Sequence, residues 1–126
     1  MADRVFYPVQ ALNPQMKIIA GSFLPNGTSA VASATTTGQG YTVARTSAGL
    51  FTITLTDRYN SLLSGQVSLA LNAVAQTVVQ FGAIDVSTAK TVLINAVTSG
   101  SAADIASNAN NRIHFLLILS NTNVVT

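Results

Sequence analysis

Residues 41–60 read YTVARTSAGLFTITLTDRYN and predict two antiparallel strands joined by a tight turn. Within residues 50–56, large apolar side chains alternate with threonine, and this period of two is typical of a strand with one buried face. A turn at residues 47–49 joins that strand to another at residues 41–46, and Gly49 can adopt the positive φ that a short loop needs. The alternation predicts that three side chains face a core: Phe51, Ile53 and Leu55.

The segment after this hairpin, residues 57–63, breaks the alternation. Asp57 is a residue type that caps helices, and Leu62 and Leu63 follow it closely enough to fold back on a short helical turn. We therefore expect Asp57 to cap such a turn, with strand structure resuming at residue 66; a local ion pair with Arg58 is the alternative.

The rest of the chain also reads as short strands separated by polar or glycine-containing links. Further strands are predicted at residues 16–23, 66–73, 76–84, 91–98 and 112–121, with a short edge strand or loop at 28–40 and a long connection at 99–111. No segment shows a sustained period of 3.6 between capping residues, so no long helix is expected. About eight strands with frequent turns predict an all-β, antiparallel β-sandwich, jelly-roll-like, and an up-and-down barrel is the alternative.

Residues 1–15 contain two prolines, at positions 8 and 14, and are expected to form an extended N-terminal arm before a single domain at residues 16–126. Proline removes a backbone donor and disfavours regular strand pairing. The arm offers four apolar side chains as candidate contacts with a partner: Phe6, Tyr7, Val9 and Leu12. The alternative is that the arm packs on its own sandwich.

The composition is apolar and poor in charge. Hydrophobic residues make up 48% of the 126 residues and charged residues only 8%, against about 25% in an ordinary soluble domain. The six basic residues are scattered, which argues against nucleic acid as a partner. We expect no signal peptide, synthesis in the cytoplasm and no membrane contact, because residues 1–4 lack a basic segment followed by an apolar run and the longest apolar run, residues 115–119, is too short to cross a bilayer.

The chain offers few groups for catalysis. It has one histidine, no glutamate and no cysteine. His114 lies in the strand IHFLLIL on the face shared with Leu116 and Ile118, where a packed or interface histidine is more common than a general base. We therefore expect no enzyme activity, no catalytic or metal-binding residues, no cofactor and no small-molecule substrate.

Residues 113–119 are apolar on both faces of the predicted strand. One face can fill the core, whereas the other would meet water in an isolated sandwich. We expect this second face to be covered in a homo-dimer or homo-trimer, with Leu116 and Ile118 at the contact and His114 at its edge. Cover by the chain's own arm is the alternative.

One run of the sequence resembles a family. Residues 43–59 fit the pattern V-A-R-x-S-x-G-x-[FY]-T-[IV]-T-L-x-D-x-[FY], which is similar to that of head decoration, or cement, proteins of tailed bacteriophages. The resemblance, which extends over about residues 40–120, implies a jelly-roll virion protein without enzyme activity. It also implies binding to the outer surface of an icosahedral capsid, where such proteins clamp subunits of the major capsid protein. A receptor- or carbohydrate-binding module of a phage fibre is the alternative, although the chain has no tryptophan and its tyrosines are dispersed.

Overall fold

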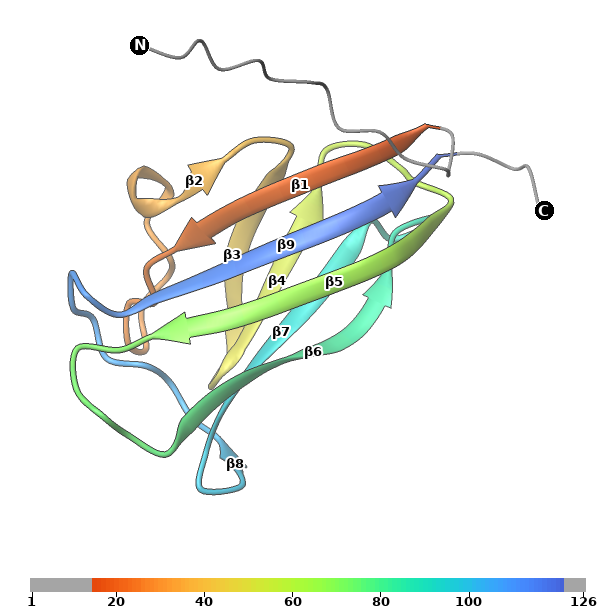
Figure 1. Cartoon of the computed structure of the whole chain (residues 1–126). Coiled ribbons are helices and arrows are strands. Elements are labelled where there is room, and N and C mark those ends of the chain that lie inside the picture. The colour runs from red at the N-terminus through yellow and green to blue at the C-terminus, as the bar shows by residue number, and fades with distance from the viewer. Residues whose placement is uncertain (1–14, 122–126) are drawn as a thin grey trace, which may run out of the picture.

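The computed structural model describes residues 15–121, and its regular structure consists of strands and one short 3-10 turn (Figure 1). In chain order the elements are β1 (Met16–Phe23), η1 (Ser33–Thr35), β2 (Thr37–Gly38), β3 (Tyr41–Ser47), β4 (Leu50–Leu55), β5 (Ser61–Ala70), β6 (Thr77–Asp85), β7 (Thr91–Thr98), β8 (Ser101–Ala102) and β9 (Arg112–Ser120).

The strands form two antiparallel sheets that face each other (Figure 1). Sheet A has the order β2-β1-β9-β5, so the first and last long strands are neighbours. Sheet B has the order β3-β4-β7-β6, with β8 paired to β7, and its hairpins are β3–β4, β6–β7 and β7–β8. The prediction of an all-β, antiparallel sandwich is confirmed, with nine strands in place of about eight.

The core lies between the sheets and follows the predicted alternation of β4. Phe51, Ile53 and Leu55 are almost completely buried, as predicted. The Phe51 ring packs against that of Phe23 from β1, with the ring centroids 5.2 Å apart. From sheet A, β9 contributes the inward residues Ile113, Phe115, Leu117 and Leu119. The two central strands β4 and β9 therefore supply much of the apolar contact between the layers.

The turn between β3 and β4 shows why glycine stands at position 49. Gly49 has a φ of 66°, and a Cβ added to it would lie 2.6 Å from the carbonyl oxygen of Ala96. Both the left-handed conformation and the close backbone contact favour the residue without a side chain.

The prediction for residues 57–63 is wrong. Asp57 lies in a bend and caps no helix, and β5 begins at Ser61 rather than at residue 66. Leu62 pairs with Leu119 of β9, but the register then shifts before Ser64. This bulge leaves Leu63 on the outside of the sandwich, 44% exposed. A bulge adds one residue to a strand and interrupts its alternation, so the start of β5 does not show a period of two.

The side of the sandwich where β2 and β3 lie is held together by Tyr41. Its hydroxyl donates to the carbonyl oxygens of Thr37 and Ser22, and its ring packs edge-on against Phe115 with centroids 4.8 Å apart. A Cβ on Gly21 would overlap this hydroxyl, so the glycine leaves room for the contact between the sheets.

Residues 1–14 of the predicted arm lie outside the described residues.

The buried face of β4 can be tested with two substitutions. Phe51→Ala is expected to cost about 3–5 kcal/mol of unfolding free energy, because it removes a fully buried aromatic side chain. Thr54→Ala, three residues away on the exposed face of the same strand, should cost less than about 1 kcal/mol. Thermal or urea unfolding of the two variants measures both values, and equal losses would contradict the assignment of the two faces.

Candidate functional site

An apolar patch lies on the outer face of sheet A, on the side away from the core. Leu116 and Ile118 of β9 project there, as the sequence predicted, and both are half-buried. In the register of the sheet, Ile18 of β1 lies opposite Ile118, and Ala20 lies opposite Leu116. We call the outer-face patch the residues Ile18, Ala20, Leu63, Leu116 and Ile118.

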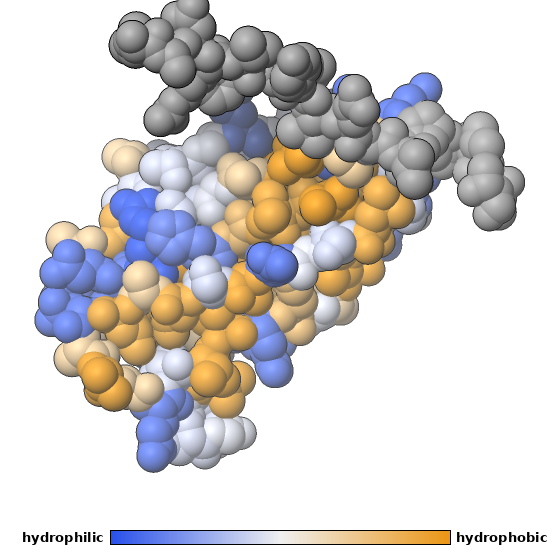
Figure 2. All heavy atoms as spheres, in the orientation of Figure 1, coloured by the Kyte–Doolittle hydropathy of each residue, from blue (hydrophilic) through white to orange (hydrophobic). Residues whose placement is uncertain are grey.

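The outer-face patch is formed by residues from three strands that are far apart in the sequence. Ile18 is 52% exposed and Leu63 is 44% exposed, on the two strands that flank β9. Figure 2 shows hydrophobic surface running across the face of the molecule that sheet A presents. Contiguous exposed apolar surface of this kind typically marks a contact site in a soluble protein.

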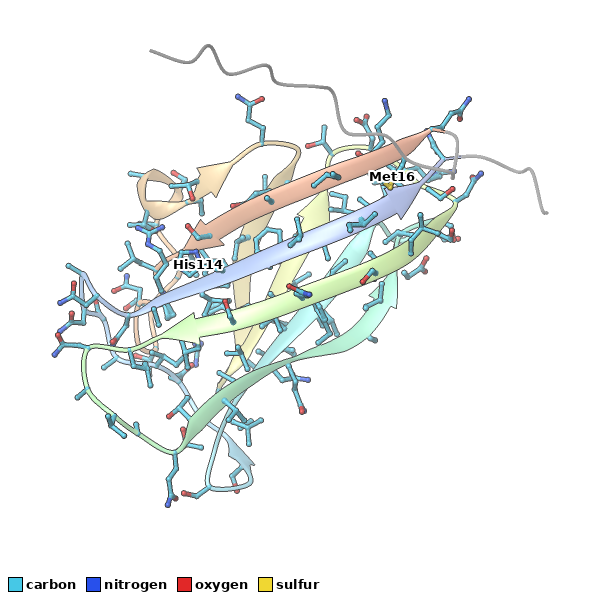
Figure 3. The ribbon with its side chains drawn as sticks, in the orientation of Figure 1. Met16 and His114 are labelled. Atoms are coloured by element: carbon cyan, nitrogen blue, oxygen red, sulfur yellow. The ribbon has the colours of Figure 1, made fainter. Side chains whose placement is uncertain are left out.

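Polar groups border the outer-face patch on the side of β9 where that strand begins. His114 is exposed, and its register neighbours are Ser22 on β1 and Ser68 on β5. Figure 3 places His114 and Met16 towards opposite ends of sheet A. A surface hollow of about 400 Å³ lies here, lined by Gln66, Val67, Ser68, His114, Phe115 and Leu116.

Arg112 lies beyond His114 and is held by uncharged groups. Its guanidinium donates to Ser22 Oγ at 2.8 Å and to the carbonyl oxygen of Thr35 at 3.1 Å. Within residues 15–121 no carboxylate forms an ion pair with it. The outer face of sheet A therefore combines an apolar patch with a positive charge at one end.

The outer face of sheet B differs because polar residues interrupt its apolar ones. Neighbouring cross-strand pairs there include Thr42 with Thr54, Ala44 with Thr52, and Leu50 with Asn95. Val78 of β6 is 58% exposed on this face. Sheet A thus presents the more continuous apolar surface.

The structure brings together no recognisable catalytic or metal-binding group in the part of the chain that it describes. No cluster of three or more potential metal ligands occurs among residues 15–121. His114 is flanked in the sheet by serines rather than by a carboxylate. Within the same residues, no helix has the length and apolar character needed to span a bilayer.

The one ion pair among the described residues has a structural position. Arg45 of β3 makes two contacts with Asp104, of 2.9 and 2.8 Å, and their side chains are 19% and 16% exposed. Asp104 Oδ1 also accepts the N–H of Gly49 at 3.0 Å. This pair ties the connection between β8 and β9 to the turn of the β3–β4 hairpin. The hydrogen bonds from Arg45 and then from Gly49 hold the pKa of Asp104 below its usual value.

The sequence predicted only part of this site. It identified His114, Leu116 and Ile118, which share one face of β9, but not Ile18, Ala20 or Leu63. The one available signal for Ile18 is the doublet Ile18-Ile19, in which one side chain must leave the core. The other interface candidates, Phe6, Tyr7, Val9 and Leu12, lie outside the described residues. Comparisons of the chain with protein-family models, with curated proteins and with solved structures each find no match.

The ion pair predicts sensitivity to acid. Because the pKa of Asp104 is lowered by folding, its ionised form stabilises the protein fully above the unfolded pKa of about 3.9. This contribution is lost as the pH falls through the lower pKa of the folded state. Asp104→Asn should therefore be less stable than the wild type at neutral pH, and the difference should shrink as the pH falls below about 4.

Urea unfolding as a function of pH measures this difference. Asp57→Asn is the matched control, because Asp57 is exposed and makes no ion pair within the described residues, and it should have little effect at any pH. A difference between wild type and Asp104→Asn that is independent of pH would contradict the assigned role.

Proposed function

We propose that this chain is a structural virion protein, a decoration or cement protein that binds the outer surface of an icosahedral phage capsid. It would stabilise contacts between subunits of the major capsid protein and would have no enzyme activity. The observation that carries a docking role is the outer-face patch, in which Ile18 and Leu63 are exposed and Leu116 and Ile118 are half-buried among the described residues. The assignment to a phage shell rests on the resemblance of residues 43–59 to such proteins.

The size of the face favours an assembly with many copies. The nine residues of β9 span about 30 Å, and neighbouring strands lie about 4.8 Å apart. The three long strands of sheet A therefore give an outer face of about 400 Å². A stable interface between two free proteins buries about 800 Å² on each partner. A single contact through this face would therefore be weak. In an assembly of many copies, other contacts would hold the same subunits close together, so that the effective concentration of the binding partner at this face would be high.

The small area of the outer face of sheet A also bears on the predicted homo-oligomer. A dimer or trimer in contact through Leu116 and Ile118 remains a proposal, and its interface would need more than this face to be stable in dilute solution. We expect copies to meet on the shell, where the capsid lattice holds them close together. Light scattering of the free protein tests this expectation, because a stable oligomer at low micromolar concentration would contradict it.

The low charge of the chain suits a permanent structural contact. Only 8% of the residues are charged, so long-range electrostatic attraction contributes little to association. An apolar contact weakens little with added salt, whereas a contact made by surface charges is screened. The fibre alternative gains no comparable support. Sugars commonly stack on exposed aromatic rings, and none of the six described aromatic residues is exposed.

Substitution of one exposed side chain on each sheet tests the proposed face. Ile18→Asp places a charge in the outer-face patch, and Val78→Asp places one at a similarly exposed position on sheet B. Ile18→Asp should weaken binding to purified capsid particles by about tenfold or more, because burial of an unpaired charge is costly. Val78→Asp should bind like the wild type.

Co-sedimentation with particles measures the binding, and thermal unfolding shows whether both variants remain folded. Equal binding of the two variants would exclude sheet A as the docking face. Absence of the wild-type chain from the outer shell in electron micrographs of particles would contradict the function itself.

A further inference from the structure

One end of the outer face of sheet A carries an arginine whose charge has no counter-ion among the described residues. Arg112 shares this face of β9 with His114, Leu116 and Ile118, because alternate side chains of a strand point the same way. Four residues of strand separate it from Leu116, which corresponds to about 13 Å. A protein that covers the outer-face patch therefore meets this guanidinium at the margin of the contact.

The guanidinium of Arg112 is held in place through one of its three nitrogen atoms. Nη1 donates to Ser22 Oγ at 2.8 Å and to the carbonyl oxygen of Thr35 at 3.1 Å. Ser22 is itself fixed, because its side chain is buried and its hydroxyl also bonds to that of Thr37. Nε and Nη2 have no hydrogen-bond partner within residues 15–121. The planar group is thus anchored on one side and presents a free edge on the other.

The same protein shows what such an edge binds. Arg45 uses Nε and Nη2, the two atoms that are free in Arg112, to bind both carboxylate oxygens of Asp104 at 2.9 and 2.8 Å. This fork of two parallel N–H groups matches the two oxygens of a carboxylate in spacing and in charge. The free edge of Arg112 is therefore complementary to a carboxylate.

No acidic side chain among the described residues fills this role. The chain has no glutamate and four aspartates. Asp104 is bound by Arg45, and Asp85 accepts hydrogen bonds from its own turn. Asp57 forms no ion pair in the part of the chain that the structure describes. Asp3 lies outside the described residues and enters the test below.

Docking on the outer-face patch makes an acceptor for this edge necessary. A stable contact buries about 800 Å² on each partner, which is about twice the area of the outer face of sheet A, so the partner also covers the start of β9. Covering the Nε–H and Nη2–H groups without an acceptor is costly, because it buries part of an unpaired charge. A carboxylate on the partner removes this cost and adds two charge-assisted hydrogen bonds.

We propose that Arg112 binds an aspartate or glutamate side chain of the protein that docks on the outer-face patch. Nε–H and Nη2–H each donate to one oxygen of that carboxylate. The partner surface then combines apolar side chains opposite the patch with an acidic side chain about 13 Å from the point that faces Leu116. This inference rests on the proposed function, in which the partner is the major capsid protein.

Two variants that each remove one positive charge test the proposal. Arg112→Gln should bind purified capsid particles about tenfold more weakly or worse, because it leaves the partner's carboxylate buried and unpaired. Lys17→Gln is the matched control, because Lys17 is exposed, lies near the opposite end of sheet A and points to the other face of β1 from Ile18. It should bind like the wild type. Co-sedimentation with particles measures both affinities.

A third variant separates the shape of the guanidinium from its charge. Arg112→Lys keeps the positive charge but cannot donate two parallel hydrogen bonds, so it should bind several-fold more weakly than the wild type. It also serves if Arg112→Gln, which loses the bonds to Ser22 and Thr35, does not fold. Thermal unfolding of the free variants shows which of them are folded at the assay temperature.

The outcomes that contradict the inference are distinct from those that contradict the function. Wild-type binding by Arg112→Gln or by Arg112→Lys, or equal losses in Arg112→Gln and Lys17→Gln, would overturn the inference and leave the proposed function intact. Asp3→Asn should bind like the wild type, and a loss equal to that of Arg112→Gln would place the carboxylate in the chain itself and overturn the inference. Failure of the wild type to bind would overturn the function and the inference together.

Electron cryo-microscopy of decorated particles identifies the acceptor directly. The map should show an acidic side chain of the major capsid protein with its oxygens about 2.7–2.9 Å from Nε and Nη2 of Arg112. A backbone carbonyl at this position, or an Arg112 side chain that remains in solvent, would overturn the inference even if the chain lies on the outer shell.

Discussion

The structure depends on β9, which is apolar on both faces and lies in the middle of sheet A. Its four inward residues fill the core against sheet B, and its backbone pairs with β1 on one side and β5 on the other along nearly its whole length. A central strand must satisfy its hydrogen bonds on both edges, so β1 and β5 are aligned by it. On the outer face, the side chains of β9 therefore lie between the outward side chains of β1 and β5.

The sequence predicted a strand correctly where its alternation of apolar and polar residues matches the burial of the side chains in the structure. The β3–β4 hairpin was predicted closely because β4 alternates without interruption between core and surface. The start of β5 was missed because the bulge at Leu63 breaks that alternation, and pattern alone cannot distinguish a bulged strand from a turn. The candidate site was half predicted: residues that share one strand could be recognised, but Ile18 and Leu63 join them only through the register of three strands.

Charge has a small and local role in this molecule. The Arg45–Asp104 pair attaches a long connection to a tight turn, whereas Arg112 donates to a hydroxyl and a carbonyl oxygen. Neither arrangement resembles an active site, in which several titratable groups usually perturb one another. Hydroxyl and amide side chains provide most of the remaining polarity, in keeping with a chain in which charged residues are scarce.

The position of β9 also affects how the protein folds during synthesis. All the strands of sheet B lie between residues 41 and 102, so that sheet can assemble before β9 is made. Sheet A cannot, because its central strand follows all the others in chain order and must insert between two strands made much earlier. Pairings this distant in sequence are slow to form. The nascent chain must therefore keep the edges of β1 and β5 that flank β9 apart until β9 has been made, and a chain that stops before β9 lacks the strand that joins β1 to β5.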